Sequence, residues 1–256
     1  MIGKGSMVKN FCLNFISTCG KTAFTLAEVL ITLGIIGIVA AMTLPSVIGN
    51  YQKVQTISQL KKVYTTLNQA FKRSEADNES SVYWNTDKGI DFYFNQYWKP
   101  YLNILGYCRG GHGDVDCNYK SSAPWKRANG KNDAYLVVRD SDRSAFILYD
   151  GTYISILMSS GYGSAEGAED ENGNVLGNTG GADSRIIVDL NASRIPNQLG
   201  RDTFIFDRVA GKGVMPYGYN RDEETINQNC SRNGSGMMCA AKLIRDGWEI
   251  KDDYPW

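Results

Sequence analysis

Histidine is nearly absent from this 256-residue chain, and neither sign of charge is in excess. His112 is the one histidine, whereas metal centres and acid–base catalytic sites usually recruit two or more imidazoles. It lies in the glycine-rich segment 109–114, which has no nucleophile-elbow motif. The 27 basic residues balance the 27 acidic ones, so the basic surplus typical of nucleic-acid-binding proteins is missing. We therefore predict a protein that is not an enzyme, and we do not expect nucleic acid as a partner.

A long hydrophobic run is present, and it follows a basic leader. Residues 1–23 contain three lysines and no acid, and residues 24–44 contain one charged residue, Glu28. As a helix the run would be about 31 Å long, which matches the roughly 30 Å hydrocarbon core of a bilayer. The positive-inside rule then places the N-terminus in the cytoplasm and everything from about Ser46 onward outside.

A secretory signal peptide cut near Ala40 or Ala41 is an alternative interpretation of this run. Such peptides usually have an apolar part of about 7–15 residues without an acid inside it. Glu28 is the discordant residue, because a carboxylate within an apolar span is costly and needs a partner. A cut between Ala23 and Phe24 would create an α-ammonium group one helical turn before Glu28.

Residues 21–41, from Lys-Thr-Ala-Phe-Thr-Leu-Ala-Glu to Ile-Val-Ala-Ala, resemble the processing and methylation signal of type IV prepilins and type II secretion pseudopilins. The resemblance implies that a prepilin peptidase cuts after Ala23 and N-methylates Phe24. It also implies that Glu28 steers assembly by pairing with the N-terminus of another subunit. The chain departs from the family at Ala23, where glycine is usual.

The resemblance implies a structural subunit of a type IV pilus or a type II secretion pseudopilus. Before assembly it would be a single-pass inner-membrane protein with a cytoplasmic N-terminus, and afterwards part of a periplasmic or extracellular fibre. The implied partners are other pilin or pseudopilin subunits, the prepilin peptidase and an inner-membrane assembly platform. The signal does not distinguish a pilus from a secretion pseudopilus or a competence fibre. A membrane-anchored adhesive or binding ectodomain that never polymerises is the alternative from a different class.

The N-terminal helix is expected to continue beyond the apolar run. Apolar residues recur at spacings of three or four from Val47 to Phe71, which gives one stripe on a helix reaching about Ala76. Pro45 removes a backbone hydrogen bond and should kink this helix. These features predict a cleaved leader, a transmembrane or fibre-core half-helix, an amphipathic half-helix and a globular outer domain, over residues 1–23, 24–44, 45–76 and 77–256.

The fold class predicted for the outer part is α+β, with the long helix packed on an antiparallel sheet of about four strands. This arrangement matches the ladle shape of the pilin family. Strands are expected at 134–139, 145–149, 152–158, 185–190 and 203–206, with a hairpin turn at Asp150-Gly151. The aromatic stretch 90–105 is interpreted as a short amphipathic helix disturbed by Pro100, with a strand pair as the alternative. A short helix is expected over 237–245.

The cysteines divide between two compartments. Two lie in the leader, and an even number remain in the oxidising space outside, namely Cys108, Cys117, Cys230 and Cys239. Their spacing favours two local disulfides, Cys108–Cys117 and Cys230–Cys239, among the three possible connectivities. A four-cysteine zinc site is the competing interpretation, but the intervals are too long for the usual knuckles.

A polar block between residues 189 and 204 resembles an Asp-x-Asn-Gly, Pro-Asn, Gly-x-Asp-x-Phe pattern of many bacterial prepilin-type proteins, and it departs from this pattern at Ala192, where glycine is usual. Four of its side chains carry hard oxygen donors, and some pseudopilins bind calcium near the sheet, so calcium is a candidate ligand of Asp189, Asn191, Asn197 and Asp202. The alternative is that these side chains hydrogen-bond turn backbones, since no EF-hand spacing is present.

Overall fold

The computed structural model describes residues 25–85, 88–108, 125–132, 143–157, 185–192, 194–209 and 212–256. The chain divides into two units, Met1–Gly49 and Asn50–Trp256. Helix α1 (Leu26–Asn78) contributes to both of them. The long N-terminal helix is thus confirmed, and its residues from Asn50 onward belong to the same unit as the sheet.

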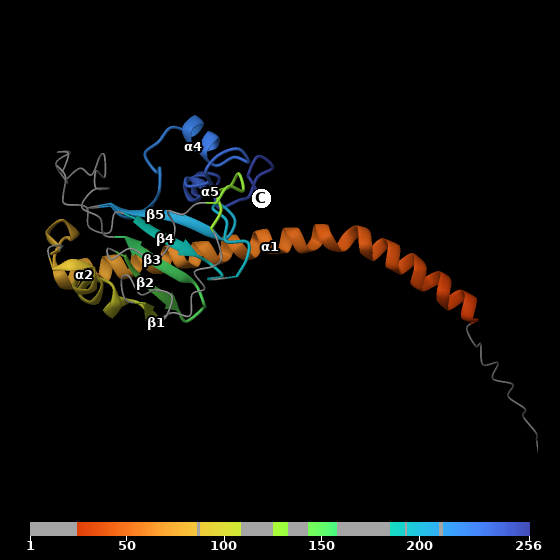
Figure 1. The fold of residues 1–256 in the computed structure, drawn as a ribbon, viewed down its shortest axis with the longest axis horizontal. Coiled ribbons are helices and arrows are strands. Elements are labelled where there is room, and N and C mark those ends of the chain that lie inside the picture. The colour runs from red at the N-terminus through yellow and green to blue at the C-terminus, as the bar shows by residue number, and fades with distance from the viewer. Residues whose placement is uncertain are drawn as a thin grey trace, which may run out of the picture. The chain divides into compact units, whose positions relative to one another are not determined.

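The second unit is built on one antiparallel sheet whose strand order follows the chain order (Figure 1). Its strands are β1 (Ile104–Cys108), β2 (Arg143–Leu148), β3 (Tyr153–Leu157), β4 (Arg185–Asp189), β5 (Thr203–Val209) and β6 (Gly213–Pro216). The predicted α+β class is confirmed, and the hairpin turn at Asp150-Gly151 joins β2 to β3 as expected. The prediction of about four strands is wrong, because β1 and β6 extend the sheet at its two edges. The strand expected at 134–139 lies outside the described residues.

One face of the sheet packs against α1. Side chains alternate across a strand, so Ile154 and Ile156 of β3 face the α1 side, whereas Tyr153 lies in a separate cluster with Trp125. The main core joins the buried positions of α1 to residues from five strands, namely Leu60, Val63, Leu67, Ala70, Phe71, Phe146, Leu148, Ile154, Ile156, Ile186, Val188, Phe204, Phe206 and Val214. Figure 1 shows this part of α1 running along the sheet.

An asparagine on α1 also bonds to the edge strand β6. Asn68 Oδ1 accepts from the Val214 backbone N–H (3.0 Å), and Asn68 Nδ2 donates to the Val214 carbonyl (3.1 Å). Edge strands expose unpaired backbone groups, and here one side chain satisfies both groups of Val214. Gly213 has a φ of +101°, and a Cβ there would stand 2.7 Å from Asn68 Oδ1, so this close approach requires glycine.

The other secondary-structure elements in the described residues are short helices. The aromatic stretch forms α2 (Gly89–Tyr97), and Pro100 falls in the following 3-10 turn η2 (Lys99–Tyr101), so the helical interpretation is right up to residue 97. The last residues of that stretch begin β1 instead. Another 3-10 turn, η1 (Ser81–Tyr83), follows α1. The helix expected over 237–245 is α5 (Cys239–Arg245), and α4 (Glu223–Asn229), which begins after an Asp222 side-chain cap, was not expected.

Candidate functional site

The apolar half of α1 is uncovered by any part of the chain that the structure describes. Every large apolar side chain from Leu26 to Val54 is at least 43% exposed, and Leu26 reaches 80%. None of the most apolar stretch is buried, and the helix is long and apolar enough to cross a membrane. A signal sequence near the N-terminus would meet the same criterion.

Glu28 lies in the first turn of α1 and forms a capping box with Thr25. Its Oε2 accepts from the Thr25 backbone N–H (2.9 Å) and from the Thr25 hydroxyl (2.8 Å). The Glu28 backbone N–H donates to Thr25 Oγ1 (3.2 Å). The box satisfies N–H groups that have no partner inside the helix. Ala23 and Phe24, the predicted cleavage and methylation site, lie outside the residues described.

The apolar stripe predicted along α1 is only partly buried. Leu60, Leu67 and Phe71 are in the core, but Val47 and Val54 are 62% and 67% exposed. The periodicity was the same along the whole stripe, so it could not show where the sheet stops covering the helix. Helix α1 continues through Pro45 without ending there. The kink expected at this residue stays a prediction.

The structure brings together all four residues considered for calcium, around the end of β4. Asp189 is fully buried, and its Oδ2 accepts from Trp125 Nε1 (3.1 Å) while its Oδ1 accepts from the Asn191 N–H (3.2 Å). Asn191 Nδ2 then donates to Asp202 Oδ2 (3.0 Å). Burial and the nearby Asp202 charge raise the pKa of Asp189 well above its usual range, and burial also raises the pKa of Asp202.

Backbone N–H groups also donate to both carboxylate oxygens of Asp202. Its Oδ2 accepts from the Asn197 N–H (2.8 Å) and its Oδ1 from the Gln198 N–H (2.6 Å). The Asn197 amide, oriented by its neighbours, donates to the carbonyls of Ala192 and Arg194. Both carboxylates therefore stabilise a turn, and a calcium ion would have to displace their N–H donors. Nowhere in the described ranges do three His, Cys, Asp or Glu side chains converge on a metal position. Calcium binding here stays a prediction.

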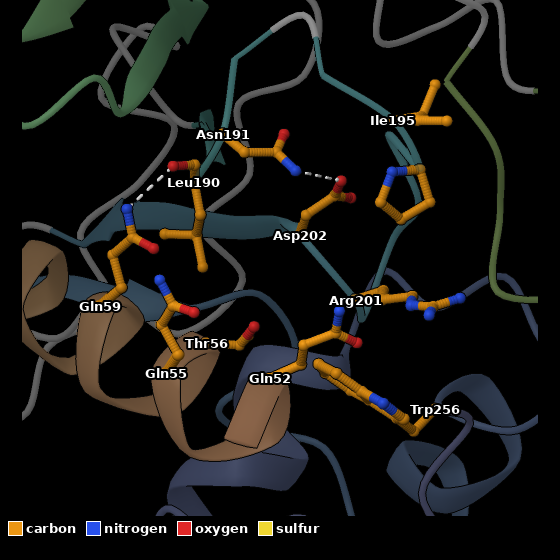
Figure 2. Close-up of a pocket in the computed structure, with 11 residues that line it drawn as sticks. Gln52, Gln55, Thr56, Gln59, Leu190, Asn191, Ile195, Arg201, Asp202 and Trp256 are labelled. Atoms are coloured by element: carbon orange, nitrogen blue, oxygen red, sulfur yellow. Dashed lines mark hydrogen bonds between the residues drawn. The ribbon is translucent and has the colours of Figure 1, made fainter. Parts of the chain in front are cut away.

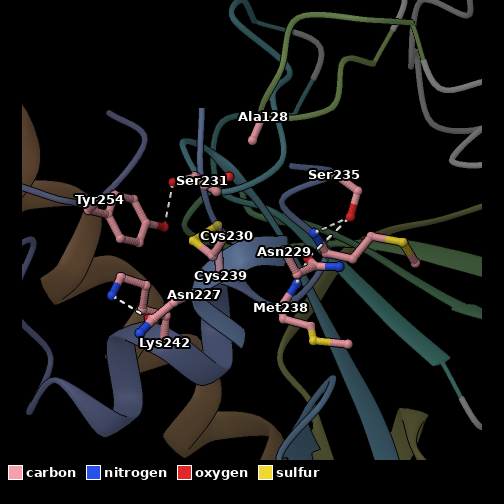
Figure 3. Close-up of a disulfide and its surroundings, with 12 residues drawn as sticks. Ala128, Asn227, Asn229, Cys230, Ser231, Ser235, Met238, Cys239, Lys242 and Tyr254 are labelled. Atoms are coloured by element: carbon pink, nitrogen blue, oxygen red, sulfur yellow. Dashed lines mark hydrogen bonds between the residues drawn. A yellow bond between two sulfur atoms is a disulfide. The ribbon is translucent and has the colours of Figure 1, made fainter. Parts of the chain in front are cut away.

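A disulfide joins Cys230 to Cys239, the local pairing favoured by the spacing (Figure 3). Both cysteines are fully buried in the main core. Next to them, the Tyr254 hydroxyl donates to the Gly200 carbonyl (2.6 Å), which attaches the C-terminal segment to the turn at residue 200. Gly200 has a φ of +83°, and a Cβ there would stand 2.7 Å from Cys239 Sγ. Cys117 of the other expected pair is not among the described residues, and neither is His112.

A polar groove of about 430 Å³ lies between α1 and the turn segment 190–202 (Figure 2). One wall comes from α1, with Gln52, Gln55, Thr56 and Gln59. The opposite wall and the end of the groove come from Leu190, Asn191, Ile195, Pro196, Arg201, Asp202 and Trp256. Gln59 bridges the two walls, since its Nε2 donates to the Leu190 carbonyl (2.9 Å).

This groove was not predicted from the sequence. Gln52, Gln55 and Gln59 are spaced by three and four residues, which places them on one face of a helix. This spacing was the only available signal, and it is equally typical of an ordinary solvated face. The residues of the opposite wall are separated from Gln59 by more than 130 positions, so the pairing depends on the fold.

Comparison with known proteins gives one partial match. A family described as a family of unknown function (DUF6613) matches residues 46–120, which include most of α1 together with α2 and β1. No curated protein and no solved structure matches the chain.

Proposed function

We propose that this chain is a prepilin-like subunit that is inserted in the inner membrane, processed at its N-terminus and assembled into a fibre. The observation that carries the proposal is the exposed apolar half of α1, with Glu28 as the only charged residue in the hydrophobic run. Burying apolar surface is favourable by roughly 25 cal/mol per Å², so this helix needs lipid around it in a membrane or other helices in a fibre.

The chemistry of the proposal centres on one pair of charges. Cleavage between Ala23 and Phe24 frees an α-ammonium group close to Glu28. In an apolar fibre core an unpaired carboxylate is costly, so subunits would be held at the stagger that brings Glu28 of one to the ammonium of another. The resemblance at residues 21–41 supports this role.

Glu28 also stabilises the start of its own helix through the capping box with Thr25. The test must distinguish this local role from charge pairing between subunits. Gln serves in a capping box as Glu does, but it carries no charge. Glu28→Gln therefore keeps an acceptor for the Thr25 donors and removes the charge, whereas Glu28→Ala removes both. The matched control is Glu223→Gln, which neutralises an exposed acid in the first turn of α4.

The experiment compares these variants in the producing cell, by membrane fractionation and by the amount of each chain recovered in sheared fibres. We expect all variants to insert in the membrane, Glu223→Gln to assemble like the wild type, and both Glu28 variants to be lost from the fibre. If Glu28→Gln assembles as well as the wild type while Glu28→Ala does not, Glu28 acts only as a helix cap and the charge pairing is wrong. If wild-type chains never crosslink to one another in the membrane or outside it, the non-polymerising anchored ectodomain is the better description.

A further inference from the structure

The groove between α1 and segment 190–202 presents polar side chains that nothing in the described chain satisfies. Gln52 and Gln55 make no hydrogen bond to any described residue, unlike Gln59, which donates to the Leu190 carbonyl. In Figure 2 both carboxamides extend from α1 toward the opposite wall. Each carboxamide offers a donor and an acceptor, which is the pair of functions that one hydroxyl group also offers.

Thr56 shows the same feature more sharply. The four other threonines within α1 donate their hydroxyls to a backbone carbonyl of the preceding turn, as Thr65 does to Lys61 (2.8 Å). Thr56 makes no such bond, and Figure 2 shows its hydroxyl directed into the groove. Because the Thr56 hydroxyl does not donate to a backbone carbonyl of its own helix, it can donate to a ligand.

At the end of the groove, the positively charged Arg201 side chain lies over the Trp256 ring. The Arg201 guanidinium lies 5.5 Å from the centre of the Trp256 ring. Within the described residues Arg201 has no carboxylate partner, because the adjacent Asp202 uses its oxygens for the turn. A guanidinium held against an indole keeps its N–H donors available for a planar anion such as a carboxylate.

From these contacts we infer that the groove binds an acidic saccharide, a chain of hydroxylated rings that carries carboxylate groups. The carboxamides of Gln52 and Gln55 and the Thr56 hydroxyl meet ring hydroxyls, and Arg201 meets one carboxylate. The exposed part of the Trp256 indole offers apolar surface for the C–H face of a ring. The volume of about 430 Å³ lies within the range of small-molecule sites. The inference does not depend on fibre assembly.

The test is calorimetric titration of the full chain in detergent micelles. The probes are a tetramer of galacturonic acid and, as the neutral comparison, maltotetraose. The variants are Arg201→Gln and Thr56→Val, and the matched control is Arg194→Gln, which removes the same charge from an exposed residue of the same segment outside the groove. Circular dichroism of each variant establishes that the fold is retained.

We expect the acidic tetramer to bind and the neutral one to bind at least tenfold more weakly. Arg201→Gln should weaken binding of the acidic tetramer about tenfold or more, since it removes a charge-assisted contact. Thr56→Val should weaken both tetramers, and Arg194→Gln should leave both unchanged. The inference is overturned if neither tetramer binds at millimolar concentration, or if Arg194→Gln and Arg201→Gln have equal effects. Binding of anionic phospholipid vesicles, but not of the tetramer, in an Arg201-dependent way would overturn it in favour of a lipid headgroup.

Discussion

Replacing Asn68 by alanine tests how the long helix is held to the edge of the sheet. Asn68 makes two hydrogen bonds to the backbone of Val214, at 3.0 and 3.1 Å, and Val214 is fully buried. Asn68→Ala leaves a buried N–H and a buried carbonyl without partners. Each such group costs about 1–3 kcal/mol, so we expect the free energy of unfolding to fall by about 2–6 kcal/mol. That is a large part of the roughly 5–15 kcal/mol typical of a folded domain.

The assay is guanidinium unfolding of the full chain in detergent, followed by tryptophan fluorescence. Trp84 and Trp98 are buried in the main core, so their emission reports unfolding of the sheet-containing unit. The control is Asn95→Ala, because among the described residues Asn95 donates only to the Asp91 carbonyl of its own helix on an exposed surface. A loss below about 0.5 kcal/mol for Asn68→Ala, or a loss equal to that of the control, would refute this account of the β6 edge.

Two further perturbations concern the disulfide and a buried acid. Cys239→Ala opens a loop with a sequence separation of nine and should cost about 2–3 kcal/mol in the same unfolding assay, and an unchanged midpoint would contradict this. Burial raises the pKa of Asp207 from 3.8 to about 6, although Arg185 partly opposes the shift. The folded state then holds this proton more tightly than the unfolded state, so stability should fall by about 2 kcal/mol as the pH rises from about 4 to about 6. Asp207→Asn should remove that component of the pH dependence, and identical pH profiles for variant and wild type would show the reasoning to be wrong.

The helix and the central strands were predictable because their signals are local and repeated. A long apolar run, followed by apolar residues at spacings of three or four, predicted α1. Runs of β-branched residues and one tight turn predicted β2, β3, β4 and β5. The edge strand β6 has only four residues, begins with glycine and ends with proline, so its propensity for a strand is weak. It pairs because β5 and Asn68 supply partners for its backbone. Helix α4 does have a signal in the sequence, an aspartate cap followed by two glutamates, although no helix was predicted there.

For each candidate site as well, some features were recognisable in the sequence and others depend on the fold. Glu28 stands out in the sequence because a single charge interrupts an apolar run, but its bond to Thr25 is a matter of side-chain geometry at the helix start. The Asp189 and Asp202 carboxylates were recognised as polar donors in a short block. Only the fold shows that backbone and side-chain N–H groups surround them. The groove joins Gln52 to Trp256 across almost the whole chain, and no local pattern specifies such a pairing.

The measurement that tests the central claim most directly is the intact mass and N-terminal sequence of the protein from its producing cell, with and without the candidate prepilin peptidase. The account predicts a mature chain that begins with N-methylated Phe24 when the peptidase is present, and an uncut chain when it is absent. A chain that remains uncut in both cells, or one cut near Ala41, would contradict the proposed processing and assembly.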